Sequence, residues 1–424
     1  MPDDELHNIE EAEEGVLGGD VAYRRGSARA ALAHRDFRLV WSGSLASNIG
    51  TWMQNAALGA LAFKLTGSSA FVAQLGFAQL GPLLLLSLVG GLLADSIDRR
   101  VLLVAGQAAQ MTLSFVLAFI AAQDDPSRAA LFFCVLGIGI FNALSAPTLS
   151  AVLPQLVGME DLPGAVSLQS VQLNLSRVIG PVIGGLIIPT VHAEGVFAIN
   201  GFTYLFAIAT LLMVRIPRPY PDHSEQGLRR VLGGFKVARE DGLVGRCLIM
   251  ITTFSFFCLS FIGLLPVIAG RNLDLNVTGS AYGLFFACFG LGAALGAIAV
   301  GTVLVDYSKA MVVRIGLPLF AVALASLALL RTPGPAFAVV FLVGLFYFST
   351  ITSLSTVLQS HLDQRVRGRV MSLWIMGFGG TVPIGLLVGG WVADHTSVST
   401  VLYAGAAIAV VLAATIDLRE RSTA

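Results

Sequence analysis

Long apolar runs, separated by short polar segments, dominate the pattern of this chain. A helix needs about 20 mostly apolar residues to cross the roughly 30 Å of hydrocarbon in a bilayer. Twelve runs are close to that length or exceed it, and we predict a spanning helix in each: 37–64, 70–94, 101–122, 130–153, 168–190, 196–214, 247–269, 281–305, 311–330, 336–358, 370–393 and 398–417. The pattern therefore predicts an all-α membrane protein with twelve transmembrane helices.

The polar segments divide these helices into two sets of six. Segment 215–246 has several prolines and many charges, which indicates a linker, with a short amphipathic helix expected around Val231–Ala238. It separates an N-terminal six-helix half, 36–214, from a C-terminal half, 247–418. Residues 1–35 are expected to form a disordered acidic tail, and 419–424 a short second tail.

The basic residues are distributed unevenly between the two sides. With the N-terminus inside, 21 of the 26 Lys and Arg fall on the inner side, and only Lys64, Arg128, Arg271 and Arg331 fall outside. Positive charge favours the cytoplasmic side of a membrane protein. We therefore expect a multi-pass protein of the inner or plasma membrane with both termini in the cytoplasm.

The two halves repeat each other. At an offset of 205, Gly180 matches Gly385, and the pair Gly184 and Gly185 matches Gly389 and Gly390. These glycines fall in the fifth and eleventh runs, as a duplication of six helices requires. Parallel repeats of this kind predict a site between the halves, near the middle of the bilayer.

Composition excludes several classes of function. Charged residues make up 12% of the chain and hydrophobic residues 55%, with a mean hydropathy of +0.80. No basic surface supports nucleic-acid binding, and no inward His/Asp pair, metal-ligand cluster or nucleotide loop supports an enzyme, so no cofactor or metal is expected. The four cysteines have no paired spacing and are interpreted as small buried apolar residues: Cys134, Cys247, Cys258 and Cys288.

The hinge between the second and third runs, Gly90–Arg100, is tight and charged. Asp95 ends the second run, and Arg99 and Arg100 open the third. Asp95 is placed to pair with arginines or to cap a neighbouring helix, while Gly91 allows close helix approach. Asp95 is therefore a candidate gate latch; the alternative is an ordinary solvated turn. In the second half, Gly301–Lys309 is the counterpart, with Asp306 in a weaker version of the role.

Arg177 is the one charge deep inside a run. A cation inside a membrane is costly unless it is paired or hydrated, so it is a functional-site hypothesis by default. Arg177 could attract an anionic substrate. Alternatively, it lies toward the cytoplasmic end of its helix and braces neighbouring spans.

Several motifs resemble the major facilitator superfamily. Gly91-x-x-x-Asp95 followed by Arg99-Arg100 is similar to its signature loop, with departures at Ser96 and Asp98. Within the superfamily, the chain most resembles bacterial siderophore and drug exporters of the enterobactin-exporter type. The strings that carry this are Phe37-Arg38-Leu39-Val40-Trp41, Gly50-Thr51-Trp52, Leu65-Thr66-Gly67-Ser68, Leu153-Pro154-Gln155-Leu156-Val157 and Arg367-Gly368-Arg369-Val370-Met371-Ser372.

The resemblance implies a cavity lined by spans one, four, seven and ten. Asn48, Trp52 and Asn55 share one face of the first span. The predicted substrate contacts are these three with Asn142, Arg177, Phe257, Phe261 and Tyr347. The alternative for the aromatic residues is lipid-facing or core packing. Gly180-Pro181 resembles the end of an antiporter motif, which favours export.

The function indicated is efflux of small amphipathic or anionic molecules by rocking of two halves. Solute uptake or facilitated diffusion is an alternative, and a non-transporting membrane sensor is another. The expected partners are a small-molecule substrate and the lipid bilayer, for a monomer, with protons as a candidate coupling ion. Because no carboxylate lies within a run, a proton would have to use peripheral groups: Asp36, Asp95, His192, Glu194 or His361.

Overall fold

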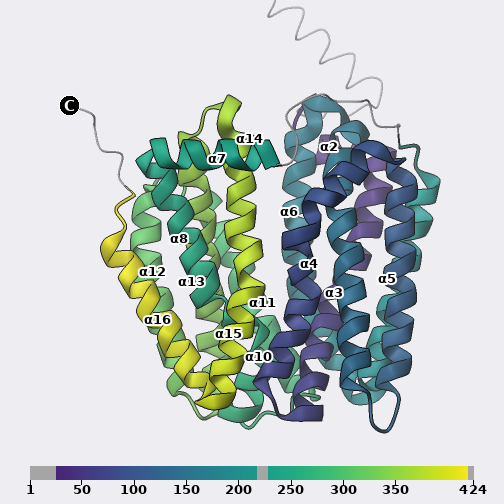
Figure 1. The fold of residues 1–424 in the computed structure, drawn as a ribbon, viewed down its shortest axis with the longest axis vertical. Coiled ribbons are helices and arrows are strands. Elements are labelled where there is room, and N and C mark those ends of the chain that lie inside the picture. The colour runs from purple at the N-terminus through teal and green to yellow at the C-terminus, as the bar shows by residue number, and fades with distance from the viewer. Residues whose placement is uncertain (1–24, 217–227, 419–424) are drawn as a thin grey trace, which may run out of the picture.

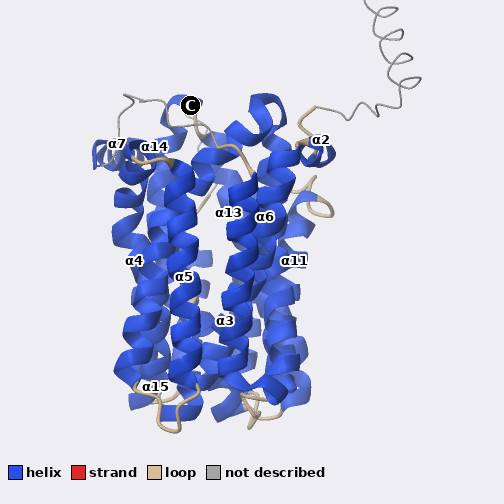
Figure 2. Ribbon diagram, turned by 90° about the vertical axis from the view of Figure 1, so that its right-hand side faces the viewer, coloured by secondary structure: helices blue, strands red, loops and turns tan. Residues whose placement is uncertain are grey.

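The computed structural model describes residues 25–216 and 228–418, and these residues form helices and no strands (Figures 1 and 2). The first set of helices is α2 (Ala28–Ala33), α3 (Arg35–Thr66), α4 (Ser69–Ser96), α5 (Arg99–Ala121) and α6 (Arg128–Met213). After α7 (Leu228–Glu240), the second set is α8 (Gly242–Cys258), α9 (Ser260–Gly263), α10 (Leu265–Val267), the π-helix η1 (Ile268–Asn272), α11 (Ser280–Gly301), α12 (Lys309–Leu329), α13 (Pro333–His361), α14 (Gln364–Ile375), the π-helix η2 (Met376–Gly380), α15 (Thr381–His395) and α16 (Val398–Thr415).

The helices match the predicted spans. Among the described residues, eight helices are long and apolar enough to cross a membrane. One of them, the 86-residue α6, overlaps three predicted spans. Its backbone leaves helical geometry at Gly158 (φ 75°) and His192 (φ 56°), which lie between these spans and divide α6 into three segments. Each of the twelve predicted runs overlaps a helical segment, which is consistent with the predicted count.

The helices form two bundles side by side, with α2–α6 in one and α8–α16 in the other (Figure 1). We call these bundles the N-half and the C-half. Helices α2 and α7 lie at the end where the described chain finishes, and we call this the terminal end. The turns at Gly67 and at 273–279 lie at the other end, which we call the opposite end.

The repeated glycines have matching roles in the two halves. A Cβ on Gly180 would lie 2.7 Å from the carbonyl oxygen of Ile49 in α3, and one on Gly385 would lie 2.0 Å from that of Phe256 in α8. Each glycine therefore allows a late helix of its half to pack tightly on the first helix of the same half.

A second pair of repeated glycines lies between the halves. Gly185 in α6 faces Gly283 in α11, where an added Cβ would meet the Cα of the other glycine at 2.2 Å. Its repeat partner Gly390 in α15 faces Ala73 in α4, with a Cβ contact of 2.4 Å. The two halves are thus pseudo-symmetric in their packing as well as in their sequence.

A buried polar network ties the N-half together. The Gln54 side-chain oxygen accepts hydrogen bonds from Ser114 Oγ at 3.1 Å and from Asn200 Nδ2 at 2.9 Å. Thr51 and Tyr204 share another hydrogen bond of 3.2 Å. Polar side chains that bond across helices stabilise a membrane bundle, so this face of α3 is structural.

Two predicted boundaries differ from the structure. The seventh span begins at Gly242 rather than 247, because Asp241 accepts hydrogen bonds from the N–H groups of Leu243 and Val244 and so caps α8. Helix α2 lies inside the segment expected to be disordered, with its N-terminus capped by Ser27. The helix expected around Val231–Ala238 lies within α7. Residues 1–24, 217–227 and 419–424 of the predicted tails and linker lie outside the described residues.

Two histidine–aspartate contacts occupy related places at the terminal end. In the N-half, His34, just before α3, lies 2.9 Å from Asp161. In the C-half, Asp241, just before α8, lies 2.7 Å from His361 at the end of α13. The histidine and the aspartate exchange places between the halves. In each half, however, the contact joins the start of the first span to the segment between the fourth and fifth spans of that half.

Both carboxyl groups of these contacts have a pKa below the ordinary value. The hydrogen bond from His34 is the main cause for Asp161, and the Gly26 N–H contributes. Burial raises the pKa of Asp241, but hydrogen bonds from the Val244 N–H, His361 and the Leu243 N–H together outweigh it.

Candidate functional site

A cavity of about 410 Å³ lies between the two halves. Helices α3, α4 and α6 line it from the N-half. Leu259 between α8 and α9, together with α9, α10, α11, α13, η2 and α15, lines it from the C-half. Its wall is mostly apolar and aromatic, and none of the described residues that line it carries a carboxylate. The aromatic and polar lining residues are Trp52, Asn55, Gln79, Arg177, Tyr282, Phe286, Phe289, Tyr347, Phe348 and Phe378.

Arg177 provides the charge of this cavity. Its guanidinium carbon lies over two rings, 4.9 Å from the centroids of Trp52 and Phe348. Trp52 belongs to the N-half and Phe348 to the C-half, so the cation contacts aromatic residues of both halves. Such cation–π contacts contribute about 0.5–2 kcal/mol, which partly offsets the cost of a cation inside the membrane.

The hydrogen-bonding capacity of Arg177 is largely unused. Within the described part of the chain, Nη1 makes one long bond of 3.5 Å to Asn174 Oδ1, and the buried Nε has no hydrogen-bond partner. Buried polar groups are usually satisfied, and an exception calls for an explanation. An anionic ligand in the cavity would supply both the missing acceptor and the missing counter-charge.

A second polar residue without a hydrogen-bond partner among the described residues lines the same cavity. The Tyr282 hydroxyl is buried without a hydrogen-bond partner in the described residues. Two further lining residues bond to each other: Gln79 Nε2 donates to Asn55 Oδ1 at 2.5 Å. The cavity therefore combines one cation and a few neutral polar groups with an aromatic wall, which is the usual make-up of a small-molecule site.

The aromatic wall is held in place by ring packing in the C-half. Tyr347 lies nearly parallel to Phe254 and Phe289, with interplanar angles of 16° and centroid distances of 6.2 Å to each. Phe261 packs edge-on against Phe289. These contacts fix the ring orientations that a ligand would meet.

The structure brings four of the eight predicted substrate contacts to the cavity: Trp52, Asn55, Arg177 and Tyr347. The other four lie outside its lining. Asn48 is half-buried on α3, Asn142 and Phe257 are exposed, and Phe261 is buried behind the wall, next to Phe289 and Phe320.

The predicted gating residues have separate positions. Gly91 and Asp95 lie in the last two turns of α4, and the Asp95 side chain lies outside the described part of the structure. Arg99 is buried and donates to the Ala151 carbonyl at 3.5 Å, and Arg100 donates to the Leu212 carbonyl. Both arginines thus contact other helices of the N-half.

The remaining gating predictions lie in packing and turn positions. Gly180 contacts α3 as described above, and the neighbouring Pro181 is buried within α6. Asp306 is exposed in the turn after α11.

Sequence reasoning missed several lining residues: Gln79, Tyr282, Phe286, Phe289, Phe348 and Phe378. Gln79 had a usable signal, because it is a polar residue in the middle of an apolar run. The aromatic residues had none, because a phenylalanine in a membrane helix usually faces lipid or core.

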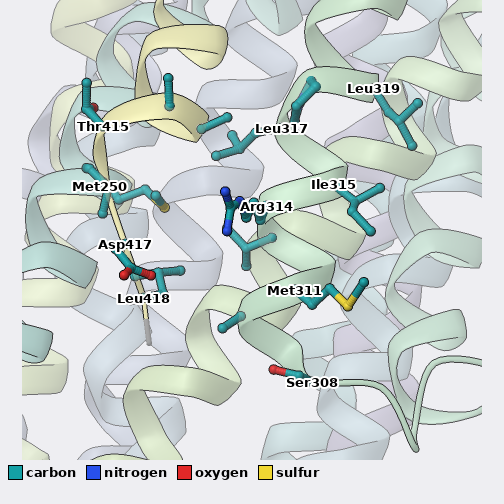
Figure 3. A pocket seen from close by; sticks show the side chains of 16 residues that line it. Met250, Ser308, Met311, Arg314, Ile315, Leu317, Leu319, Thr415, Asp417 and Leu418 are labelled. Carbon is teal, nitrogen blue, oxygen red and sulfur yellow. The ribbon is translucent and has the colours of Figure 1, made fainter. Parts of the chain in front are cut away.

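A larger cavity of about 1020 Å³ lies within the C-half (Figure 3). Its lining comes from α12, from α16 and the residues after it, and from Met250, with the Arg314 and Asp417 side chains pointing into it. None of the described N-half residues is part of its lining. Motion of one half against the other would not open and close this cavity, so we take the smaller one as the candidate transport site.

Comparison with known proteins identifies the family. Residues 26–423 match the model of the transmembrane secretion effector family. The chain belongs to this family. It is a major facilitator superfamily transporter and not an enzyme, as the motif resemblance predicted.

Curated relatives of this chain are named as exporters and transporters. The enterobactin exporter EntS of Escherichia coli O1:K1 is 28% identical over 306 residues, which is 68% of each chain. EntS of Citrobacter koseri is 27% identical over 83% of this chain and 80% of its own length. The staphyloferrin A transporter of Staphylococcus aureus is 25% identical over 84% of this chain and 88% of its own length.

Solved structures of transporters confirm the fold of this chain. The nucleoside transporter NupG has a TM-score of 0.71 at 14% identity and matches 90% of this chain and 98% of its own. A POT family transporter in complex with 5-aminolevulinic acid has a TM-score of 0.74 at 13% identity, over 90% of this chain and 95% of its own.

Proposed function

We propose that this chain exports anionic amphipathic molecules of siderophore type from the cytoplasm by alternating access of the cavity between its halves. The observation that carries the proposal is Arg177, a cation with unused hydrogen-bonding capacity in an aromatic cavity whose described lining has no carboxylate. The names of the curated relatives support export and siderophore-like substrates.

The cavity chemistry favours anions with an apolar or aromatic body. A carboxylate or similar planar anion accepts paired hydrogen bonds from a guanidinium. The rings of Trp52 and Phe348 lie beside that charge, and Phe286 adds an aromatic surface to the same cavity. A cationic molecule would be repelled by Arg177 and would find no lining acid to pair with it.

The orientation in this proposal follows the basic residues. The described members of the 21 inner Lys and Arg lie toward the terminal end, and this supports a cytoplasmic terminal end. Substrate would then enter from the terminal end and leave at the opposite end. The proton remains a candidate coupling ion, acting on groups outside the cavity, because the described lining has no acid.

Transport into inverted membrane vesicles tests the proposal. The probes are enterobactin, staphyloferrin A, a simple aryl carboxylate and an arylammonium of the same size. We expect uptake of at least one anionic probe and none of the arylammonium. Arg177→Gln should lower kcat/KM for that probe by about tenfold or more, the loss of one charge-assisted contact of about 1.5–3 kcal/mol.

Arg314→Gln is the matched control, because Arg314 lines the larger cavity within the C-half. Equal losses from the two arginine variants would contradict the assignment of the site. Uptake of the arylammonium in preference to the anions would contradict the substrate class. Equilibration that ignores an imposed proton gradient would replace coupled export with facilitated diffusion.

A further inference from the structure

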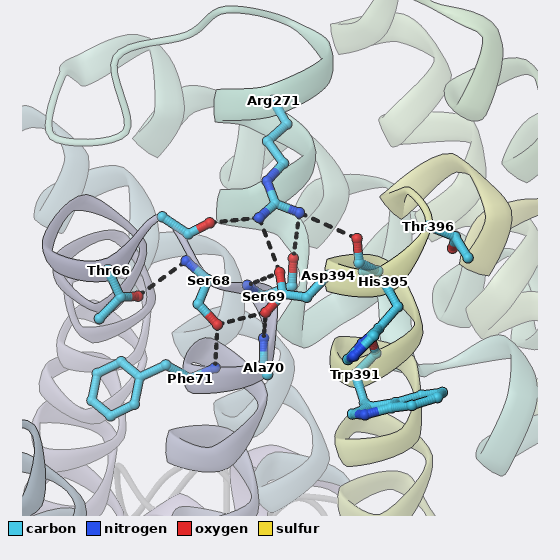
Figure 4. Close-up of polar contacts among 12 residues, drawn as sticks. Thr66, Ser68, Ser69, Ala70, Phe71, Arg271, Trp391, Asp394, His395 and Thr396 are labelled. Carbon is cyan, nitrogen blue, oxygen red and sulfur yellow. Dashed lines mark hydrogen bonds and ion pairs between the residues drawn. The ribbon is translucent and has the colours of Figure 1, made fainter.

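A dense set of polar contacts joins the halves at the opposite end, around Asp394 (Figure 4). One carboxylate oxygen accepts from the Ser69 N–H at 2.7 Å and from Arg271 Nη2 at 2.9 Å. The other accepts from Ser68 Oγ at 2.5 Å and from the Ala70 N–H at 2.9 Å. Asp394, at the end of α15, therefore caps the start of α4 in the other half.

Arg271 reinforces the same contact from η1. Its Nη1 donates to Ser69 Oγ at 2.9 Å, and its Nη2 donates to the Gly67 carbonyl at 2.5 Å. Its guanidinium carbon also lies 5.8 Å from the ring centroid of Phe63 in α3. The arginine of the C-half thus contacts the end of α3 and the start of α4, both in the N-half.

The electrostatics of this cluster are favourable and local. The Asp394 carboxylate accepts hydrogen bonds from Ser68, the Ser69 and Ala70 N–H groups and Arg271. It is also close to the positive end of the α4 dipole. These contacts stabilise the ionised form of Asp394.

The cluster occupies only one of two symmetric positions. The repeat places α4 beside α15 at Gly390, and α11 beside α6 at Gly185. At the second position, the N-cap residue of α11 is Gly279, which has no side chain to make a capping hydrogen bond. The first contact thus carries charge, whereas the second rests on glycine packing.

From this asymmetry we infer that Asp394 and Arg271 form an outer latch that holds the opposite end shut while the cavity faces the terminal end. Helices α4 and α15 run antiparallel: Asp394 at the end of α15 meets the start of α4, and Gly380, just before α15, faces Leu84 in the middle of α4. Asp394 ends α15, and Asp95 lies in the last turn of α4. Asp394 thus closes the opposite end in this state.

The latch proposal rests on the alternating access of the proposed function. It can nevertheless be tested without a substrate. Val72 is 4% exposed, lines the cavity and lies one turn into α4. In a background where the four native cysteines are replaced, Val72→Cys reports opening of the opposite end through labelling by a membrane-impermeant thiol reagent added from that side of intact cells.

We expect Asp394→Asn and Arg271→Gln each to speed labelling of this reporter by about fivefold or more. The exchange of both charges, Arg271→Asp with Asp394→Arg, should not restore slow labelling, because an arginine cannot accept from the α4 N–H groups. Asp394→Glu should restore part of it. The first result would show a gate contact, whereas a purely structural role would lower membrane levels and leave the labelling rate unchanged.

Two matched controls lie at the same end. Arg331 donates to the carbonyls of Ala328 and Leu330 within the C-half, and Asp274 is exposed. Arg331→Gln and Asp274→Asn should leave labelling at the reference rate. Reference-rate labelling in Asp394→Asn and Arg271→Gln would overturn the latch, as would failure of both variants to reach the membrane, since a gate contact is dispensable for insertion. Faster labelling without siderophore transport would keep the latch and remove the proposed substrate.

Discussion

At the scale of single residues, the most informative feature is the contact of Arg177 with one aromatic residue from each half. A cation held between moving bodies has surroundings that change with conformation. When Phe348 moves away from Trp52, Arg177 loses one of its two ring contacts. The affinity for an anion should therefore differ between the two states of the transporter.

Removal of the ring at Phe348 should weaken binding without unfolding the protein. Phe348→Leu keeps an apolar side chain but loses a cation–π contact of about 0.5–2 kcal/mol, so the Kd for a transported anion should rise about 2- to 30-fold. Isothermal titration in detergent measures this change. Phe348→Tyr should stay near the reference, and so should Phe257→Leu, because Phe257 lies outside the cavity lining. An unchanged Kd in Phe348→Leu would show that this ring does not position Arg177.

Sequence reasoning finds Arg177 and Trp52 but not Phe348 or Tyr282. A lone charge stands out in an apolar run, and so does a face that combines Trp52 with two asparagines. An aromatic residue in a membrane helix does not stand out, because lipid, core and cavity all accept it. Only the packing of the helices decides among these environments, and that packing depends on contacts between distant residues.

At the scale of elements, the predicted helices are largely correct and their ends are not. Hydrophobic length determines where a helix crosses the membrane, but capping determines where it begins. The start of α8 at Gly242 depends on Asp241, which caps the helix and also contacts His361, 120 positions away. The latch likewise joins Arg271 to Asp394, 123 positions apart. Neither pairing can be read from the local pattern.

Loss of the Asp241 cap should destabilise the C-half. Asp241→Ala removes the acceptor for the Leu243 and Val244 N–H groups and should cost about 0.5–2 kcal/mol. Asp241→Asn should keep most of the stability, because asparagine is also a good N-cap. Thermal unfolding in detergent at neutral pH compares the variants. Equal melting temperatures for Asp241→Ala and the reference would show that the cap contributes nothing.

Low pH should remove the stability that the Asp241 cap contributes. The folded-state pKa of Asp241 is lowered, so its stabilising effect is complete above the ordinary carboxyl pKa of about 3.9 and is lost as the pH falls through the lower folded value. The difference in stability between the reference and Asp241→Ala should thus be constant from pH 7 to about pH 5 and shrink below pH 4. A difference that disappears between pH 7 and pH 6, well above the carboxyl range, would contradict this assignment.

At the scale of the whole molecule, the repeat separates two kinds of glycine that look alike in sequence. Gly180 and Gly385 hold each half together, whereas Gly185 and Gly390 allow the halves to touch at the opposite end. Both pairs appear at the same offset in the chain. The repeat therefore predicts that paired positions share a role, and the structure distinguishes the role inside a half from the role between halves.

Alanine at these positions should separate folding from gating. Gly185→Ala and Gly390→Ala place a Cβ at 2.2 Å and 2.4 Å from the facing helix, so the halves must move apart at the opposite end. Labelling of the Val72→Cys reporter should then become faster, with near-normal membrane levels. Gly180→Ala and Gly385→Ala should instead lower thermal stability, by about 1–3 kcal/mol for overpacking, and leave the labelling rate of the folded fraction unchanged.

Gly301→Ala is the neutral reference, because nothing lies within 4 Å of its added Cβ. The two outcomes are separable, since one is a rate measured on intact cells and the other is an unfolding transition in detergent. If all four variants moved both quantities together, the halves would behave as one cooperative body. The contact at the opposite end would then be part of the folding core, and rigid rocking about the central cavity would not describe this transporter.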